Sequence, residues 1–124
     1  MKEKSIFLEK EGYSPKNKVL DFLIVHQEFD YSIKEIAKYA EVSYPCMKQL
    51  KKELIKDKWV VLTRKVGRSQ MYKLNIRNSK VKKFIDFFWE VIEQEIEGKH
   101  KELRKEHVGS SSPVGAVSVS AKSI

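Results

Sequence analysis

The strongest constraint in this sequence is a pair of short helical patterns within residues 30–58, joined by only three residues. The first helix is predicted to begin at Ser32, which is followed three residues later by Glu35, as in a capping box. The second is predicted to begin at Ser43, another residue type that caps helices. Because residues 41–43 alone join the two helices, the helices must cross at a steep angle.

Apolar residues recur at helical intervals in these two segments and in one segment before them. In the pair of helices they are Ile33, Ile36, Ala37 and Ala40, then Met47, Leu50 and Leu54. The earlier helix is predicted to begin with Ser14 as its cap and Pro15 at its first position. Its buried stripe is expected to be Val19, Leu20, Leu23 and Ile24. Residues 6–8 are expected to form a further turn of helix that packs on the domain or on a partner.

A β-hairpin is predicted around Gly67 and Arg68, which suit a two-residue turn with glycine first. With that turn, the opposed pairs on one side of the ribbon are Trp59 with Ile76, Val61 with Leu74, and Thr63 with Tyr72. The pairs on the other side are Leu62 with Lys73 and Arg64 with Met71. This register gives one apolar face, which would pack on the core, and one mixed face.

A long helix is predicted after Asn78, which can cap it. Its apolar positions exceed the single stripe that one small domain can bury: Val81, Phe84, Ile85, Phe87, Phe88, Trp89, Val91 and Ile92. We expect a dimer interface on this helix, formed by Phe84, Phe87, Phe88, Val91 and Ile92. The alternative is that the extra face packs on residues 6–8 of its own chain. Gly98 is expected to end the helix, and residues 109–124 are expected to be a disordered tail.

The chain has 124 residues, of which 41% are hydrophobic, and this suits a single domain with one modest core. The formal net charge is +8, and residues 32–77 hold essentially all of the excess, with 12 basic and 4 acidic residues. Such a segment favours an acidic partner, such as nucleic acid or an anionic membrane. A single cysteine, Cys46, excludes an intramolecular disulfide. Without a signal peptide or a membrane-spanning apolar run, a cytoplasmic location is expected.

The order of helix, short helix, tight turn, helix, hairpin and long helix is that of a winged helix-turn-helix, a mainly α fold with a small β-hairpin. In this fold the second helix of the pair enters the major groove of DNA, and the hairpin, called the wing, touches the adjacent backbone or minor groove. The basic segment coincides with these two elements. The predicted parts are an N-terminal extension (1–13), a DNA-binding domain (14–77), a long dimerisation helix (78–108) and the tail (109–124).

Residues 31–75 resemble the winged helix-turn-helix of MarR-like and ArsR-like transcription regulators, most closely the small archaeal-type members. The sequence of this segment is YSIKEIAKYAEVSYPCMKQLKKELIKDKWVVLTRKVGRSQMYKLN. The resemblance extends over about residues 14–92. Two residues depart from the pattern: Lys58 stands where the family commonly has a glycine that closes the second helix, and Lys51 stands at a position that is often apolar. The paired cysteines of metal-sensing ArsR-like proteins are absent, which disfavours metal sensing.

The residues expected to contact DNA fall on three short stretches. On the second helix of the pair they are Ser43, Tyr44, Pro45, Lys48, Gln49 and Lys52. In the wing they are Arg64, Lys65, Gly67, Arg68 and Gln70, and near the start of the first helix Ser32 and Lys34 are expected to contact phosphate. Gln49 can pair with adenine, Lys48 can reach guanine or phosphate, and Arg68 suits a narrow minor groove. The alternative for each of these residues is a merely solvated surface position.

We therefore predict a sequence-specific transcriptional regulator that binds double-stranded DNA as a homodimer, with no membrane partner. The alternatives are a plasmid or viral replication or partition protein with the same fold, and a winged-helix module that docks an acidic protein. No catalytic motif is present, and His26, His100 and His107 lack metal-site spacing, so no enzymatic activity, metal or cofactor is expected. Cys46 is either a small packing residue or a redox switch.

Overall fold

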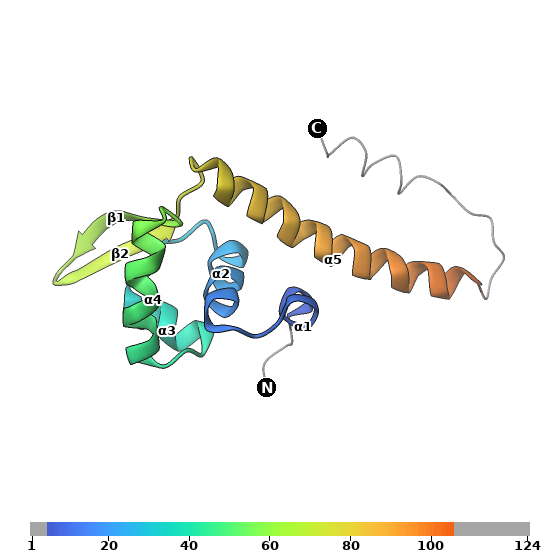
Figure 1. Ribbon diagram of the computed structural model, residues 1–124, viewed down its shortest axis with the longest axis horizontal. Coiled ribbons are helices and arrows are strands. Elements are labelled where there is room, and N and C mark those ends of the chain that lie inside the picture. Colours follow the sequence, from blue (N-terminus) through green and yellow to red (C-terminus); the bar gives the residue numbers. More distant parts are fainter. Residues whose placement is uncertain (1–4, 106–124) are drawn as a thin grey trace.

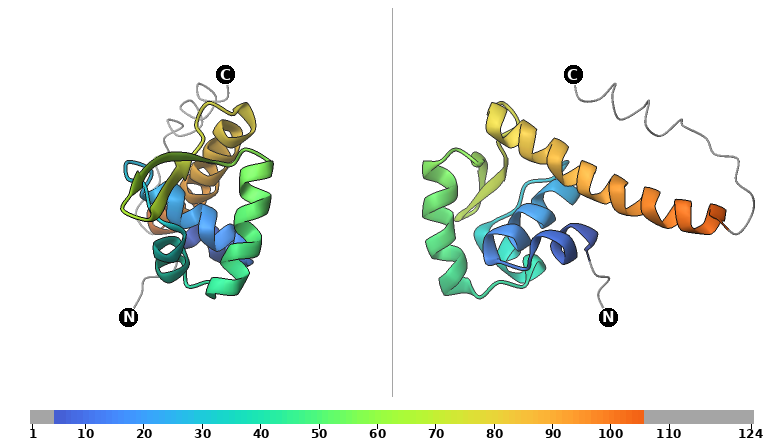
Figure 2. Two further views of the ribbon diagram at one scale, coloured as in Figure 1. Left: turned by 90° about the vertical axis from the view of Figure 1, so that its left-hand side faces the viewer. Right: turned by 45° about the vertical axis from the view of Figure 1, so that its right-hand side comes forward.

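Five helices and a two-stranded antiparallel hairpin make up the part of the chain that the computed structural model describes, residues 5–105, with side chains through residue 99. In chain order they are α1 (Ile6–Glu11), α2 (Pro15–Val25), α3 (Ile33–Ala40), α4 (Tyr44–Lys56), β1 (Val60–Val66), β2 (Ser69–Leu74) and α5 (Ser79–Lys105). The far end of α5 extends away from the other elements (Figures 1 and 2). Among the described helices, none combines the length and the apolarity that crossing a bilayer requires. The predicted tail, 109–124, lies outside the described residues.

The predicted capping serines are present at the starts of α2, α3 and α4. Ser14 Oγ accepts a backbone N–H of the first turn of α2 at 3.1 Å. At α3 both halves of the capping box are present, because Ser32 Oγ accepts the Glu35 N–H at 3.2 Å and the Ser32 N–H donates to Glu35 Oε1 at 2.9 Å. Ser43 Oγ caps α4 in the same way at 3.3 Å. These bonds satisfy N–H groups that a helix start otherwise leaves without partners, so they fix where each helix begins.

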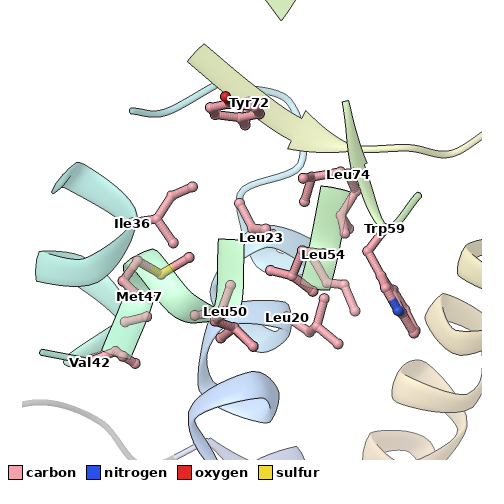
Figure 3. Packing of buried hydrophobic residues seen from close by; sticks show 14 of the residues in the cluster. Leu20, Leu23, Ile36, Val42, Met47, Leu50, Leu54, Trp59, Tyr72 and Leu74 are labelled. Carbon is pink, nitrogen blue, oxygen red and sulfur yellow. The ribbon is translucent and has the colours of Figure 1, made fainter. Parts of the chain in front are cut away.

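The predicted apolar stripes of α2, α3 and α4 meet in one hydrophobic core (Figure 3). Its buried helix residues include all but one of the predicted positions: Val19, Leu20, Leu23, Ile24, Ile36, Ala37, Ala40, Met47, Leu50 and Leu54. The remaining one, Ile33, is half-buried against the same cluster. Trp59, Tyr72 and Leu74 add the hairpin to this core. Since burying one large aliphatic side chain contributes about 1.5–3 kcal/mol, this packing holds α4 and the hairpin in a fixed relation.

The tip of the hairpin has the predicted turn and register. Gly67 has a φ of 63°, as a two-residue turn with glycine first requires. Val66 lies opposite Ser69, and Arg64 lies opposite Met71, as predicted. The side chains of residues 64–70 therefore keep the alternation expected from the sequence.

Beyond the tip the predicted register is wrong by one residue, because a β-bulge lies between Leu62 and Arg64. The predicted pairs that fail are Trp59 with Ile76, Val61 with Leu74, Thr63 with Tyr72, and Leu62 with Lys73; Tyr72 instead lies opposite Leu62, and Leu74 opposite Val60. Val60 is consequently buried, whereas Val61, Thr63 and Ile76, which we expected on the core face, are exposed.

Another backbone contact fastens the wing to the helices. The Tyr31 N–H donates to the Tyr72 carbonyl at 2.9 Å, and the Tyr72 N–H donates to the Tyr31 carbonyl at 2.8 Å. Tyr31 lies just before α3, in the connection from α2. The wing is thus attached by backbone hydrogen bonds on the edge of β2 as well as by its buried side chains.

The long helix α5 begins as predicted and ends later than predicted. Asn78 Oδ1 accepts the Lys80 N–H at 2.9 Å and so caps the helix. Gly98, expected to end it, lies inside α5, which continues to Lys105. A glycine inside a helix costs only about 1 kcal/mol relative to alanine, so a single glycine does not by itself end a helix.

The extra apolar face of α5 packs partly on its own chain, through α1. Phe7 is 1% exposed, and its ring centroid lies 5.7 Å from that of Phe84, 6.1 Å from Phe87 and 4.9 Å from Phe88. Phe88 is buried as well, so the intrachain alternative accounts for this residue. Phe87, next to Phe7, and Trp89 each remain 44% exposed, and a spacing of two residues puts them on different sides of α5.

Candidate nucleic-acid interface

The outer face of α4 carries all the residues predicted for the second helix of the pair. Because Met47, Leu50 and Leu54 are buried, the opposite side of the helix faces solvent. The exposed predicted residues are Ser43, Tyr44, Pro45, Lys48, Gln49 and Lys52. All of them except Ser43 line one shallow hollow. The Lys48 ammonium lies 5.6 Å from the centroid of the Tyr44 ring, a cation–π distance.

A second hollow brings the start of α3, the start of α4 and the wing together. Predicted residues from each of these elements line it: Ser32 and Lys34, Tyr44, and Lys65, Arg68 and Gln70. The two hollows adjoin, since they share Ile33, Tyr44 and Lys51. None of the residues that line either hollow is acidic, so cations dominate both surfaces. Segments that are distant in sequence thus form one basic, concave face.

Lys51 is a member of this face that sequence reasoning did not assign to it. Its side chain is half-buried, and its ammonium lies 5.7 Å from the centroid of the Tyr72 ring, so it bridges α4 and β2. The sequence signal was present, because Lys51 stands at a position that is often apolar in the resembling family. The aliphatic part of a lysine can fill such a position while its charged end reaches the surface.

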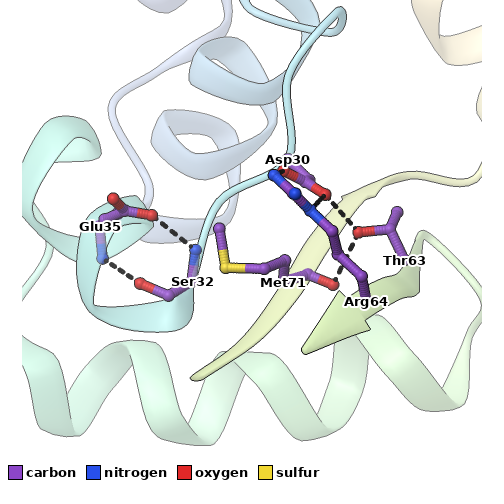
Figure 4. Close-up of polar contacts among 6 residues, drawn as sticks. All are labelled: Asp30, Ser32, Glu35, Thr63, Arg64 and Met71. Carbon is purple, nitrogen blue, oxygen red and sulfur yellow. Dashed lines mark hydrogen bonds and ion pairs between the residues drawn. The ribbon is translucent and has the colours of Figure 1, made fainter. Parts of the chain in front are cut away.

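Arg64 is the predicted wing cation that is not part of the lining of this face. Its guanidinium binds Asp30 with two hydrogen bonds, from Nε to Oδ2 at 3.0 Å and from Nη2 to Oδ1 at 3.1 Å (Figure 4). Thr63 Oγ1 also donates to Asp30 Oδ2. The hydrogen bonds from Arg64 and then from Thr63 lower the pKa of Asp30 to about 2, and the hydrogen bonds that Arg64 donates to Asp30 raise the pKa of Arg64. Nothing in the predicted hairpin register pointed to Asp30 or to this contact.

The remaining predicted residues are placed as follows. Gly67 lies at the wing tip, and a Cβ there would meet no atom within 4 Å, so the tip is open to a close approach. Gln70 Oε1 accepts the Tyr72 hydroxyl at 3.2 Å, which leaves its amide NH₂ group for other partners. The oxygens of Ser32 and Ser43 accept helix N–H groups, and their hydroxyl hydrogens can still donate to phosphate. Among the described residues, no three acidic, histidine or cysteine side chains are grouped closely enough to hold a metal ion.

No family model matches the chain, and no curated protein matches it in sequence. Several solved structures do resemble its fold. MepR, a transcription regulator of the Staphylococcus aureus multidrug efflux pump MepA, has a TM-score of 0.55 at 20% identity, covering 82% of this chain and 79% of that chain. The adhesin competence repressor AdcR from Streptococcus pyogenes has a TM-score of 0.54 at 15% identity, covering 85% and 74%.

A cysteine-to-serine variant of MarR from E. coli has a TM-score of 0.52 at 16% identity, covering 96% of this chain and 82% of that chain. The chain thus has the winged-helix fold of MarR-family regulators, as the resemblance predicted. These similar proteins are bacterial, so they do not support the expected likeness to archaeal-type members.

Proposed function

We propose that this chain, which has the fold of MarR-family regulators, is a transcriptional regulator that binds double-stranded DNA sequence-specifically as a homodimer. One observation carries the proposal: the outer face of α4 and the cations of α3 and the wing adjoin on one concave surface without a carboxylate in its lining. The DNA backbone is a polyanion, and such a surface attracts it independently of sequence. The proteins of similar structure include a transcription regulator and a repressor by name, which agrees with this function.

Sequence discrimination is assigned to α4, whose outer side chains would enter the major groove. Gln49 has the amide that pairs bidentately with adenine, and Lys48 has a donor for guanine. Tyr44 is 44% exposed and lines both hollows, so its hydroxyl would reach the sugar-phosphate backbone beside the groove.

Orientation on the duplex is assigned to the wing and to the start of α3. Arg68, next to Gly67 at the tip, would enter the adjacent minor groove, where a narrow A/T-rich stretch attracts arginine. Lys65 and Lys34 line the same hollow as Arg68 and would hold phosphates on either side of it. The N–H groups at the capped start of α3 add a positive dipole end to this site.

Dimerisation is assigned to the part of α5 that α1 leaves uncovered. Trp89 and Ile96 are each 44% exposed, and their spacing of seven residues puts them on one side of this helix. Large exposed apolar side chains on one element mark an interaction surface, and self-association through a twofold axis is the commonest arrangement. A twofold axis would place the two α4 helices in successive major grooves, about 34 Å apart.

Arg68→Ala tests the wing. We expect weaker binding to most duplexes and a salt dependence whose slope, log affinity against log salt, is smaller by about 1.8, because each of the two subunits loses one cation that neutralises phosphate. Fluorescence anisotropy over a salt series measures both quantities. Lys99→Ala, an exposed cation on α5, is the control and should change neither. Equal affinity and equal slope for Arg68→Ala and the unchanged chain would show that the wing assignment is wrong.

Gln49→Ala tests sequence discrimination. We expect a change in the preferred bases at one position, with the salt slope unchanged, because a base contact is lost rather than a phosphate contact. Selection of bound sites from random DNA provides the readout, and a palindromic consensus would also report the twofold symmetry. Failure of the unchanged chain to retain any duplex at low salt and micromolar protein would refute the proposed function and favour the protein-interaction module.

A further inference from the structure

Three hydrogen bonds converge on the Asp30 carboxylate, all from two consecutive residues of β1 (Figure 4). Arg64 binds both carboxylate oxygens, in the bidentate geometry that makes such pairs strong and directional. Thr63 adds its hydroxyl to Oδ2. Asp30 stands 34 positions before Arg64, in the connection between α2 and α3, so the contact joins the wing to a distant part of the chain.

The β-bulge explains how two neighbouring strand residues reach one carboxylate. In a regular strand, consecutive side chains point to opposite faces. The register shift between Leu62 and Arg64 inserts Thr63 as an extra residue and interrupts this alternation. Both Thr63 and Arg64 can therefore point toward Asp30, as Figure 4 shows.

The carboxylate is the more buried partner of this pair, and the guanidinium is the more exposed one. The Asp30 side chain is 14% exposed, whereas the Arg64 side chain is 62% exposed. The residue after Asp30, Tyr31, is held by two backbone hydrogen bonds to Tyr72. Without Asp30, Arg64 would be a long, largely exposed cation on the wing.

The other two wing cations face a different direction. Lys65 and Arg68 line the hollow shared with Ser32 and Lys34, whereas Arg64 is not part of that lining. The proposed interface therefore includes two of the three cations that surround Gly67, and the third is neutralised by Asp30.

We infer that Asp30 is a specificity-determining residue of the proposed DNA interface, because it holds Arg64 against the α2–α3 connection and withholds it from phosphate. The inference rests on the proposed function. A released Arg64 would add a phosphate contact on any sequence, which strengthens binding to random DNA without improving base recognition. By retaining Arg64, Asp30 raises the ratio of affinity for the preferred site to affinity for random DNA.

Asp30→Asn in the full chain is the central test, because the amide keeps the shape and loses the charge. For a random duplex, we expect tighter binding at low salt and a slope of log affinity against log salt that is steeper by about 1.8, from one added contact in each of the two subunits. Between about 50 and 200 mM salt, affinity should thus fall about 12-fold more than for the unchanged chain. The ratio of preferred-site to random-site affinity should decrease.

Two further variants separate the release of Arg64 from a general change in charge. Arg64→Gln alone should leave the slope of the unchanged chain as it is, and Asp30→Asn combined with Arg64→Gln should return the steepened slope to that value. Glu28→Gln removes the same charge from the same connection at an exposed position and should have no effect on the slope.

Several results would overturn the inference. An unchanged slope in Asp30→Asn would show that Arg64 is not withheld, and a flatter slope in Arg64→Gln would show that Arg64 already contacts phosphate. The second result is decisive even if Asp30→Asn does not fold. If the unchanged chain binds no duplex, the proposed function fails and this inference fails with it. If the unchanged chain and Asp30→Asn both bind DNA with the same slope of log affinity against log salt, this inference alone is overturned.

Discussion

Lys58 has an unusual backbone conformation for a residue with a side chain. Its φ is 60°, in the left-handed region, where the resembling family commonly has glycine. The Trp59 N–H donates to the Leu54 carbonyl at 2.8 Å across this turn, so the end of α4 requires the conformation. The sequence could locate this position, because a lysine at an expected glycine is visible without a structure.

We predict that Lys58→Gly raises the free energy of unfolding by about 1 kcal/mol, because glycine adopts the left-handed region without steric cost. Equilibrium unfolding in urea provides the measurement. Glu53→Gly, at an exposed position inside α4, is the control and should lower the free energy of unfolding by about 0.5–1 kcal/mol. A loss of stability in Lys58→Gly would contradict the role given to the turn.

Asp30 makes stability depend on pH in the acidic range. Its pKa of about 2 lies below the value of about 3.9 usual in an unfolded chain, so the ionised carboxylate favours the folded state. This contribution is complete above about pH 4 and disappears as the pH falls toward 2. We expect the stability difference between the unchanged chain and Asp30→Asn to shrink over that range in thermal melts. A difference that stays constant with pH would argue against the ion pair.

In the wing, the sequence predicts the turn and the pairing next to it, but it does not predict the bulge. Its turn and the pair Arg64 with Met71 follow from local rules, since Gly67 selects the turn and the turn sets the register next to it. The bulge brings Thr63 and Arg64 to Asp30, which is distant in sequence, and no local pattern in β1 reveals it. The capping serines and the apolar stripes of α2 to α4 were predictable because each uses interactions within a few residues.

The packing of α1 against α5 is expected to contribute to the stability of the fold. Phe7 is buried among Phe84, Phe87 and Phe88, so Phe7→Ala should lower the free energy of unfolding by about 3–5 kcal/mol. Urea unfolding measures the loss. Tyr13→Ala, at a 51% exposed position after α1, is the control and should change stability by no more than about 0.5 kcal/mol. Equal effects of the two variants would show that α1 does not hold α5.

The whole molecule has its basic face on α4 and the wing and an uncovered apolar face on α5. The charge distribution along the chain predicted the basic face, because the segment with excess cations folds into adjacent elements. The apolar face of α5 was predicted only in part. Sequence reasoning recognised that α5 is too apolar for one contact, but it could not divide the face between α1 and a second subunit, since that depends on tertiary packing.

Replacing Trp89 by glutamate should convert a dimer into a monomer, because the charge would be placed at a 44% exposed position on the uncovered face. Sedimentation velocity at micromolar protein measures the mass. Lys83→Glu, at an exposed position on the same helix, is the control and should remain dimeric. A monomeric mass for the unchanged chain would refute dimerisation through α5.

Two asparagine side chains meet one carbonyl between α4 and α5. The Lys58 carbonyl accepts the Asn75 amide at 3.2 Å and the Asn78 amide at 3.0 Å, while Asn78 also caps α5. Asn78 therefore links the end of the helix proposed to read DNA to the start of the helix proposed to join subunits. In a dimer, the distance between the two α4 helices would be set at this link. A substitution of Asn78 would therefore alter the spacing of the two half-sites that the protein accepts. The preferred bases within each half-site would stay the same.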